Sequence, residues 1–272
     1  MKEIGLDELR KLQLAVLQQV NDICKEQGLR YSMCGGTLLG AVRHNGYIPW
    51  DDDIDIVMPR PDYQKLIEYS MKNELPFKLM CHQNNERFCD LYAKAYDKRT
   101  VIIEESANRW DNKCGVYIDI FPADGLGNSF EEAQKTLNLS RFNRELLVAA
   151  NWKKFKKSKT HSWYIEPVRF AFFLLSRFVN PKKLIEKIER TYIRRNFDDS
   201  NVVGVVCGSY RDRELMPIEY YSEFVLMKFE GREFQGLKNY DGYLKKIYGD
   251  YMQLPPENKR ITHHSFTPYY ID

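Results

Sequence analysis

The feature that most constrains this chain is DDDIDIVMP at residues 51–59, where four aspartates fall within five positions. Like charges this close repel one another, yet the run leads directly into an apolar stretch rich in β-branched residues, which is typical of a buried strand. Alternate side chains of a strand share a face, so we expect Asp53 and Asp55 on one side and Ile54 and Ile56 on the other. An acidic strand face of this kind requires a positive partner.

A divalent cation would be such a partner. Carboxylates at this spacing can converge on Mg²⁺, which prefers oxygen ligands and accepts substrate phosphates in the rest of its shell. A third acid, Asp119, interrupts the apolar stretch GVYIDIFP, where a carboxylate is costly unless it is paired or bound to metal. Beside Asp53 and Asp55 it would complete a metal site suited to phosphoryl transfer and could accept the proton of an incoming hydroxyl.

Other interpretations of these acids stay open. The run could be a solvated acidic turn. Four acids match positions 1, 3, 5 and 12 of a helix–loop–helix calcium loop, namely Asp51, Asp53, Asp55 and Asp62. Ile56, however, stands where that loop needs glycine. Asp119 could be a strand-end acid facing water, and Asp124, shortly after Pro122, is predicted to be a turn residue.

A glycine pair precedes the acidic run, in CGGTLLGAVRHNG at residues 34–46. Gly35, Gly36 and Thr37 come just ahead of a predicted helix, where backbone amides could point at a phosphate. A tight turn explains the same glycines equally well. Arg43 and His44 could add positive charge for a phosphate, although both residue types are also common on surfaces.

The rest of the chain predicts a mixed α/β fold of the α+β kind, a mixed sheet flanked by helices. Apolar residues recur at helical spacing over 6–27, and Pro61 suggests a helix start near residue 60. Expected strands cover 77–82, 89–96, 100–106, 115–122 and 201–208, with a hairpin at 224–236 and further helices at 129–150 and 239–248. A change in composition near 128 suggests a boundary between an α/β part at 1–128 and a more helical part at 129–272.

Charge and cysteine content narrow the function classes. The net charge is only +3, which does not favour a protein that coats nucleic acid. No apolar run approaches the roughly 20 residues needed to cross a bilayer, and the polar N-terminal segment does not read as a secretory signal. The six cysteines form no CxxC pair, so reduced thiols in the cytoplasm are the simplest expectation.

A lysine-rich and aromatic segment covers residues 153–179. Five lysines at 153–159 precede an apolar helix candidate that also carries arginines. This composition is typical of a segment that lies on an anionic membrane face. A core helix after a solvated basic loop is the equal alternative.

The residues around the acidic run resemble a known family. GGTLLGAVRHNGYIPWDDDIDIVMPRPDY, at 35–63, resembles the signature of the LicD family, which is part of the DNA polymerase β-like nucleotidyltransferase superfamily and distantly related to the fukutin-type transferases. The superfamily pattern is a glycine pair, an Asp-hydrophobic-Asp-hydrophobic strand and a third acid on a later strand. GVYIDIFPADG at 115–125 and YGDYMQLPPENKR at 248–260 also resemble the family.

This resemblance implies a small mixed sheet flanked by helices, with a metal site at one edge. It implies a nucleotidyltransferase-like catalytic core at 1–128 and a region at 129–272 that completes the donor and acceptor site. It implies a phosphotransferase that moves phosphocholine from CDP-choline to a sugar hydroxyl of a cell-surface glycan or teichoic-acid precursor and releases CMP. Relatives move other phospho-alcohols, such as glycerol or ribitol phosphate, from CDP donors. The acceptor could be linked to a lipid. Two alternatives are a nucleotidyltransferase that transfers NMP from an NTP to a small acceptor and a non-catalytic glycan-binding member of the fold.

The resemblance also assigns roles to residues. Mg²⁺, or Mn²⁺ in its place, would be held by Asp53, Asp55 and Asp119, the last of which would also deprotonate the acceptor. Phosphate contacts would come from Gly35, Gly36, Thr37, Arg43, His44 and Lys94, and the loop at 47–50 would pack over the site. Aromatic faces bind a quaternary ammonium well, and candidates for a choline site in the C-terminal third are Tyr210, Tyr220, Tyr221, Tyr240, Tyr243, Tyr269 and Tyr270.

Overall fold

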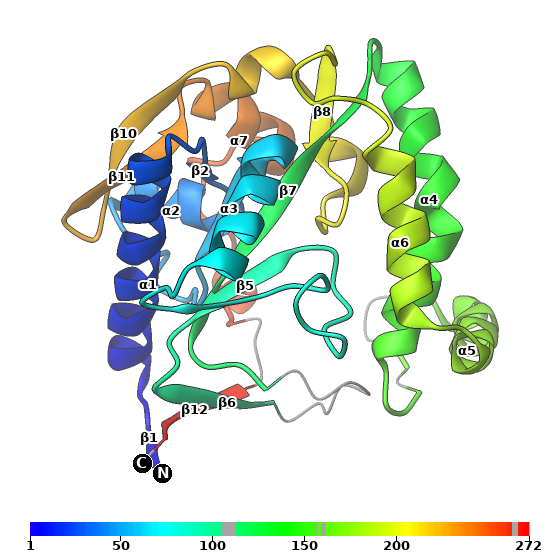
Figure 1. Cartoon of the computed structure of the whole chain (residues 1–272), viewed down its shortest axis with the longest axis horizontal. Helices are drawn as coiled ribbons and strands as arrows, with labels where there is room; N and C mark the ends of the chain where they lie inside the picture. Colours follow the sequence, from blue (N-terminus) through cyan, green and yellow to red (C-terminus); the bar gives the residue numbers. More distant parts are fainter. Residues whose placement is uncertain (105–112, 156, 159–161, 263–265, 272) are drawn as a thin grey trace.

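The computed structural model describes residues 1–104, 113–155, 157–158, 162–262 and 266–271 (Figure 1). Its α-helices are α1 (Leu6–Gln27), α2 (Gly35–His44), α3 (Arg60–Lys72), α4 (Phe130–Asn151), α5 (Glu166–Leu175), α6 (Pro181–Tyr192) and α7 (Tyr240–Tyr248). Its strands are β1 (Lys2–Glu3), β2 (Ser32–Met33), β3 (Asp55–Pro59), β4 (Lys78–Met80), β5 (Ala93–Tyr96), β6 (Thr100–Glu104), β7 (Tyr117–Gly127), β8 (Val202–Val205), β9 (Met216–Pro217), β10 (Phe224–Phe229), β11 (Arg232–Leu237) and β12 (Phe266–Tyr270). The last two residues of the strand expected at 100–106 lie outside the described residues.

The central sheet is mixed, as predicted. Its strands run in the order β2-β3-β7-β5-β4, and β8 and β9 extend it from the other end of β7. β3 and β7 pair in parallel, which sets Asp55 opposite Asp119, whereas the remaining pairs are antiparallel. In Figure 1, α1 and α3 lie in front of this sheet, and α4 and α6 lie at its side. The predicted class, a mixed sheet flanked by helices, is confirmed.

The long strand β7 joins the two halves of the chain. Its first half pairs with β3 and β5, and its second half pairs with β8, with an irregularity between Gly125 and Gly127. Asp124 lies in this second half and is buried, where Arg60 donates to both of its carboxylate oxygens at 2.6 and 2.9 Å. The prediction that Asp124 is a turn residue was therefore wrong, because its partner lies on a distant helix.

The helix α1 illustrates how local pattern sets an element. Its buried face includes Leu9, Leu12, Val16 and Val20, which follow helical spacing. It ends at Gly28, which has a left-handed φ of 64° and donates its backbone N–H to carbonyls of the last turn. The helix therefore packs against the sheet with one face and stops where glycine relieves the backbone.

The two largest hydrophobic clusters cover the sheet. The larger one collects side chains from the first strands and helices together with the β10–β11 hairpin and α7. The smaller one lies between α4, α6 and the β7–β8 end of the sheet. The predicted boundary at residue 128 falls between the end of β7 and the start of α4, and as a domain boundary it stays a prediction.

A small sheet brings the two ends of the chain together. β12 pairs with β1 on one side and with β6 on the other, so the termini lie side by side in Figure 1. Among the helices within the described ranges, none combines the length and apolar character required to cross a membrane.

Candidate active site

The acidic run forms a loop that leads into the sheet. Asp51, Asp52 and Asp53 lie between α2 and β3, and each offers a carboxylate oxygen within 4.8 Å of the others. β3 begins only at Asp55, so Asp53 precedes the strand. The expectation that Asp53 and Asp55 share a strand face was therefore wrong. The three carboxylates therefore converge in the loop that precedes β3.

Asp55 and Asp119 come together through strand pairing. They are register partners on β3 and β7, and Asp119 donates its backbone N–H to the Ile54 carbonyl at 2.9 Å. On the other side, Asp119 pairs with Lys94 of β5, whose Nζ donates to Asp119 Oδ1 at 2.8 Å. Lys94 is buried, and its Nζ lies 3.4 Å from the centre of the Tyr117 ring. The third predicted acid thus lies beside the second, with a buried lysine as its partner.

Two acids of this cluster, Asp51 and Asp55, have a pKa above that of an ordinary aspartate. Burial, followed by repulsion from Asp53, raises the pKa of Asp51 to about 7. Burial also raises the pKa of Asp55 well above its usual range, with further contributions from Asp53 and Asp119. Burial and mutual repulsion disfavour the charged form of these carboxylates, and a cation bound between them would stabilise it. Carboxylate oxygens are ligands that suit Mg²⁺ or Mn²⁺.

The glycine pair allows the acids to approach the N-terminus of α2. Gly35 has a φ of 53°, and a Cβ at Gly36 would lie 2.6 Å from Asp51 Oδ2. Thr37 is buried, and its hydroxyl oxygen accepts the backbone N–H of Asp55 at 2.8 Å. These three residues thus position the aspartates directly, and α2 begins at Gly35 itself.

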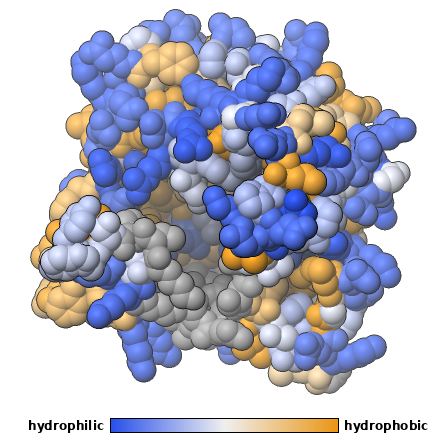
Figure 2. Space-filling model, turned by 180° about the vertical axis from the view of Figure 1, so that it is seen from behind, coloured by the Kyte–Doolittle hydropathy of each residue, from blue (hydrophilic) through white to orange (hydrophobic). Residues whose placement is uncertain are grey.

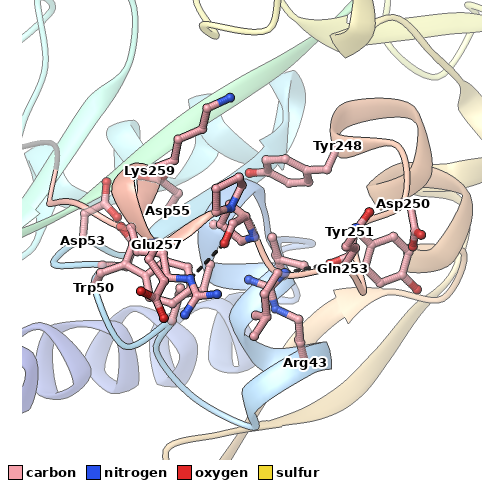
Figure 3. Close-up of a pocket in the computed structure, with 18 of the residues that line it drawn as sticks. Arg43, Trp50, Asp53, Asp55, Tyr248, Asp250, Tyr251, Gln253, Glu257 and Lys259 are labelled. Carbon is pink, nitrogen blue, oxygen red and sulfur yellow. Dashed lines mark hydrogen bonds between the residues drawn. The ribbon is translucent and has the colours of Figure 1, made fainter.

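A pocket of about 800 Å³ opens beside the cluster (Figure 3). Of the predicted site residues, the pocket is lined by Gly36, Arg43, Asp53 and Asp55. Those that the structure places outside the pocket lining are Gly35, Thr37, His44, Lys94 and Asp119. His44 Nε2 instead accepts from Arg43 Nε at 3.0 Å, while Arg43 Nη1 donates to the Tyr251 carbonyl at 2.8 Å. Arg43 therefore connects α2 to the opposite wall.

That opposite wall comes from the C-terminal segment 248–260. It contributes Tyr248, Asp250, Tyr251, Gln253, Leu254, Pro255, Pro256, Glu257, Lys259 and Arg260. The guanidinium of Arg260 lies over the Trp50 ring, 5.5 Å from its centre. Of the seven tyrosines predicted as a choline site, Tyr210 lines the pocket, and its hydroxyl donates to Tyr248 at 2.9 Å. The resemblance of this segment to the family was the only signal that it belongs to the site.

An arginine on α1 fixes the acidic loop. Arg10 donates from Nε and Nη2 to the Asp51 carbonyl, and Nη2 also lies 3.2 Å from the Ile48 carbonyl and 3.0 Å from the Pro49 carbonyl. Gln13 Nε2 donates to the Asp52 carbonyl at 2.9 Å. The sequence analysis did not predict these contacts of Arg10 and Gln13 with the acidic loop. A polar residue on the buried face of α1, Gln13, could have indicated that this helix contacts a polar segment.

The calcium-loop alternative is not supported by these contacts. Asp62 would have closed such a loop, but it lies on α3 and accepts from Arg30 Nε at 2.7 Å. Asp55 begins a strand rather than continuing a loop. The acids instead belong to two parallel strands and the loop before them.

Comparisons with known proteins assign the chain to a family. A model described as "LicD/FKTN/FKRP, nucleotidyltransferase domain" matches residues 28–161, which contain the glycine pair, the acidic loop, β3 and β7. Over its full length the chain is similar to a protein of Haemophilus influenzae named lipopolysaccharide cholinephosphotransferase LicD, with 30% identity over 285 aligned positions that cover all of both chains. The chain belongs to the LicD family.

Shorter similarities connect it to two uncharacterized proteins of Rickettsia. One, from Rickettsia typhi, is 36% identical over 63 residues, which cover 23% of this chain and 20% of the relative. The other, from Rickettsia prowazekii, is 40% identical over 47 residues, which cover 17% of this chain and 18% of the relative.

Proposed function

We propose that the chain is a phosphotransferase that moves phosphocholine from CDP-choline to a sugar hydroxyl of a cell-surface glycan precursor and releases CMP. The observation that carries this proposal is the full-length similarity to a lipopolysaccharide cholinephosphotransferase. The acidic cluster beside a large pocket supports it, because phosphoryl transfer needs little beyond positioning and charge stabilisation.

Asp53 and Asp55 would hold a divalent cation, with Asp51 and Asp119 close by. When bound, Mg²⁺ or Mn²⁺ would neutralise the charge of the donor diphosphate and of the departing CMP. The acceptor oxygen would form a bond to the phosphorus that bears choline as the bond to CMP breaks. Asp119, which Lys94 fixes through Oδ1, would take the proton of the acceptor hydroxyl.

Further residues of the pocket offer groups for the rest of the donor. Arg43, Lys259 and Arg260 line the pocket and would balance phosphate charge. Trp50 and Tyr248 present aromatic faces, which attract a quaternary ammonium group. A glycerol or ribitol donor would use hydrogen-bonding groups instead, so the identity of the alcohol is a direct test of this assignment.

The first experiment is a thermal-shift panel with CDP-choline, CDP-ethanolamine, CDP-glycerol and CDP-ribitol, each with Mg²⁺. A ligand that binds only the native state raises its melting temperature, and we expect the largest rise with CDP-choline. Transfer is then followed as CMP release in the presence of a glycan acceptor. A larger rise with another donor would reassign the alcohol, and no CMP with any donor would contradict the reaction.

Variants test the acids. Asp53→Asn and Asp55→Asn should each reduce CMP release by at least about a hundredfold, because each removes a carboxylate from the proposed cation site. Asp7→Asn, which removes an exposed acid on α1, is the matched control and should retain full activity. Near-normal turnover of the Asp53→Asn variant, with an unchanged fold, would remove that residue from the role.

A second candidate is a nucleotidyltransferase that transfers NMP from an NTP, since the matching family model is described as a nucleotidyltransferase domain. The products separate the two reactions. Pyrophosphate release from an NTP, without CMP release from CDP-choline, would favour the second candidate.

A further inference from the structure

The helix α5 is apolar but has no buried residue. Apart from Glu166, Pro167 and Arg169, every residue of it is hydrophobic. It packs on α4 from one side, where the Phe172 and Phe142 rings lie 5.2 Å apart. An apolar helix with no buried residue is expected to be covered by something else.

Six exposed apolar side chains lie on α5 and in the residues that flank it, and we call them together the α5 face. It consists of Trp163, Tyr164, Val168, Leu174, Leu175 and Phe178. Trp163 is 83% and Phe178 is 90% exposed, so neither contributes to a core. In Figure 1 α5 projects from the edge of the molecule beyond α4 and α6, and Figure 2 shows apolar side chains on that edge, at the left of the view.

Lysines accompany the α5 face. Lys153, Lys154 and Lys157 are exposed, and no ion pair joins them to any residue that the structure describes. The Phe155 ring lies 5.1 Å from that of Phe170 and 5.9 Å from that of Phe173. These ring contacts hold the lysine segment against α5, so positive charge and apolar side chains lie together.

Negative charge is nearly absent from the segment at residues 152–179. Glu166 is the only acid between residues 152 and 179. It accepts from Arg169 Nη1 at 2.8 and 2.9 Å, which neutralises it. The α5 face and the lysine segment beside it therefore combine apolar and aromatic side chains with a net positive charge.

We propose that the α5 face docks on the surface of an anionic lipid bilayer. Tryptophan and tyrosine prefer the interface between water and lipid, aliphatic side chains enter the acyl boundary, and lysines attract anionic head groups. Charge complementarity selects this occupant over a second copy of the chain, because two such surfaces would set their lysines against each other. Docking of this kind goes beyond the transfer reaction and does not depend on it.

The test is cosedimentation of the full chain with lipid vesicles. One set contains phosphatidylcholine alone, and the other contains equal parts of phosphatidylcholine and phosphatidylglycerol, so that recognition of a choline head group would not mimic the effect of charge. We expect binding to the anionic vesicles and little to the neutral ones. Higher salt should weaken that binding.

Two variants separate the contributions. Lys153→Gln with Lys154→Gln and Lys157→Gln should lower the partition onto anionic vesicles about a hundredfold. Trp163→Ala with Phe178→Ala should lower it at least about tenfold, since both rings lose their apolar contact with lipid. The matched control, Lys25→Gln with Lys72→Gln and Lys228→Gln, removes the same charge from exposed positions on α1, α3 and β10 and should bind as the unaltered chain does.

Three outcomes would overturn the proposal. The first is no binding of the unaltered chain to either kind of vesicle. The second is equal loss of binding in the control and the Lys153, Lys154 and Lys157 variant. The third is a dimer, seen by light scattering, that the Trp163→Ala and Phe178→Ala changes convert to a monomer, because a second copy would then be the occupant of the α5 face. Circular dichroism of each variant confirms that it is folded.

Discussion

A buried lysine faces the acid that is proposed to take the acceptor proton. Lys94 and Asp119 are register partners on β5 and β7, and their side chains are only 10% and 13% exposed. A pair of this kind need not stabilise the protein relative to apolar residues, but removal of one partner leaves a buried charge uncompensated. The fixed Nζ contact therefore serves chiefly to orient Asp119 beside Asp55.

We expect Lys94→Met to lower the free energy of unfolding by about 3–5 kcal/mol, because the buried Asp119 carboxylate loses its partner. Urea denaturation measures this change. Lys98→Met is the control, since Lys98 is exposed and pairs with Glu74 only at 4.0 Å, and it should cost less than about 1 kcal/mol. Equal losses in the two variants would show that the buried Lys94–Asp119 pair affects the free energy of unfolding no more than an exposed pair does.

Glu214 provides a second test at this scale, away from the acidic cluster. It is buried, its Oε2 has no hydrogen-bond partner among the residues that the structure describes, and burial raises its pKa to about 8. A carboxyl whose folded-state pKa is raised stabilises the fold at low pH, and this stability is lost as the pH rises toward the folded pKa. Between pH 4.5 and about 8 the loss is about 1.4 kcal/mol per pH unit.

Glu214→Gln removes this titration. As the pH is raised from 5 to 8, the free energy of unfolding of the unaltered chain should therefore fall relative to that of the variant. Urea titrations at several pH values give the slope. A difference that is constant across this range would mean that Glu214 is not raised in pKa by its burial.

Single residues also show where sequence reasoning succeeds. Asp53, Asp55, Gly36 and Arg43 were predicted from a short local pattern, and all four line the pocket. Asp124 was assigned wrongly, because its environment is set by Arg60, which is distant in sequence. Local patterns identify which residue types can do chemistry, but burial depends on partners that the pattern does not contain.

Among the elements, α1 has a role that its amphipathic pattern does not reveal. It packs on the sheet through its apolar face, and through Arg10 it also binds three carbonyls of the acidic loop. A guanidinium presents its donors in a rigid planar fork, whereas the ammonium group of lysine is a compact charge on a flexible stem and is less preorganised for the same acceptors. The loop geometry that gathers the acids is therefore imposed partly by a helix about forty residues earlier in the chain.

We expect Arg10→Lys to loosen the acidic loop without unfolding the chain. Amide hydrogen exchange at residues 48–53 should accelerate by roughly 10–100-fold, since hydrogen bonds worth about 1 kcal/mol each are lost. Exchange in α3 should not change. Lys11→Gln, an exposed neighbour on the same helix, is the control. Unchanged exchange at 48–53 in the Arg10 variant would show that other contacts hold the loop.

The accuracy of the predicted elements follows their length. Helices and strands with a clear period, such as α1, α4 and the β10–β11 hairpin, lie where the sequence places them. β1 and β12 were not predicted, because each is short and its partner lies at the other end of the chain. The start of β3 was also placed too early, since the aspartates before it continue the alternation without joining the ladder.

On the scale of the whole molecule, the pocket exists because distant parts of the chain meet. Its acidic wall comes from residues 36–55 and its other wall largely from residues 248–260. The Arg43 contact with the Tyr251 carbonyl joins the two walls. Neither wall alone could enclose a donor. A local sequence pattern predicted the acids, whereas only the family resemblance indicated the opposite wall, because that wall comes from a distant part of the chain.

The proposed chemistry depends on a divalent cation among these acids. Crystals grown with Mn²⁺ and CDP-choline allow its position to be measured, because manganese scatters anomalously. We expect an anomalous peak within bonding distance of Asp53 and Asp55 and next to the diphosphate of the donor. A bound donor with no peak at these carboxylates, or a peak elsewhere in the pocket, would contradict the proposed site.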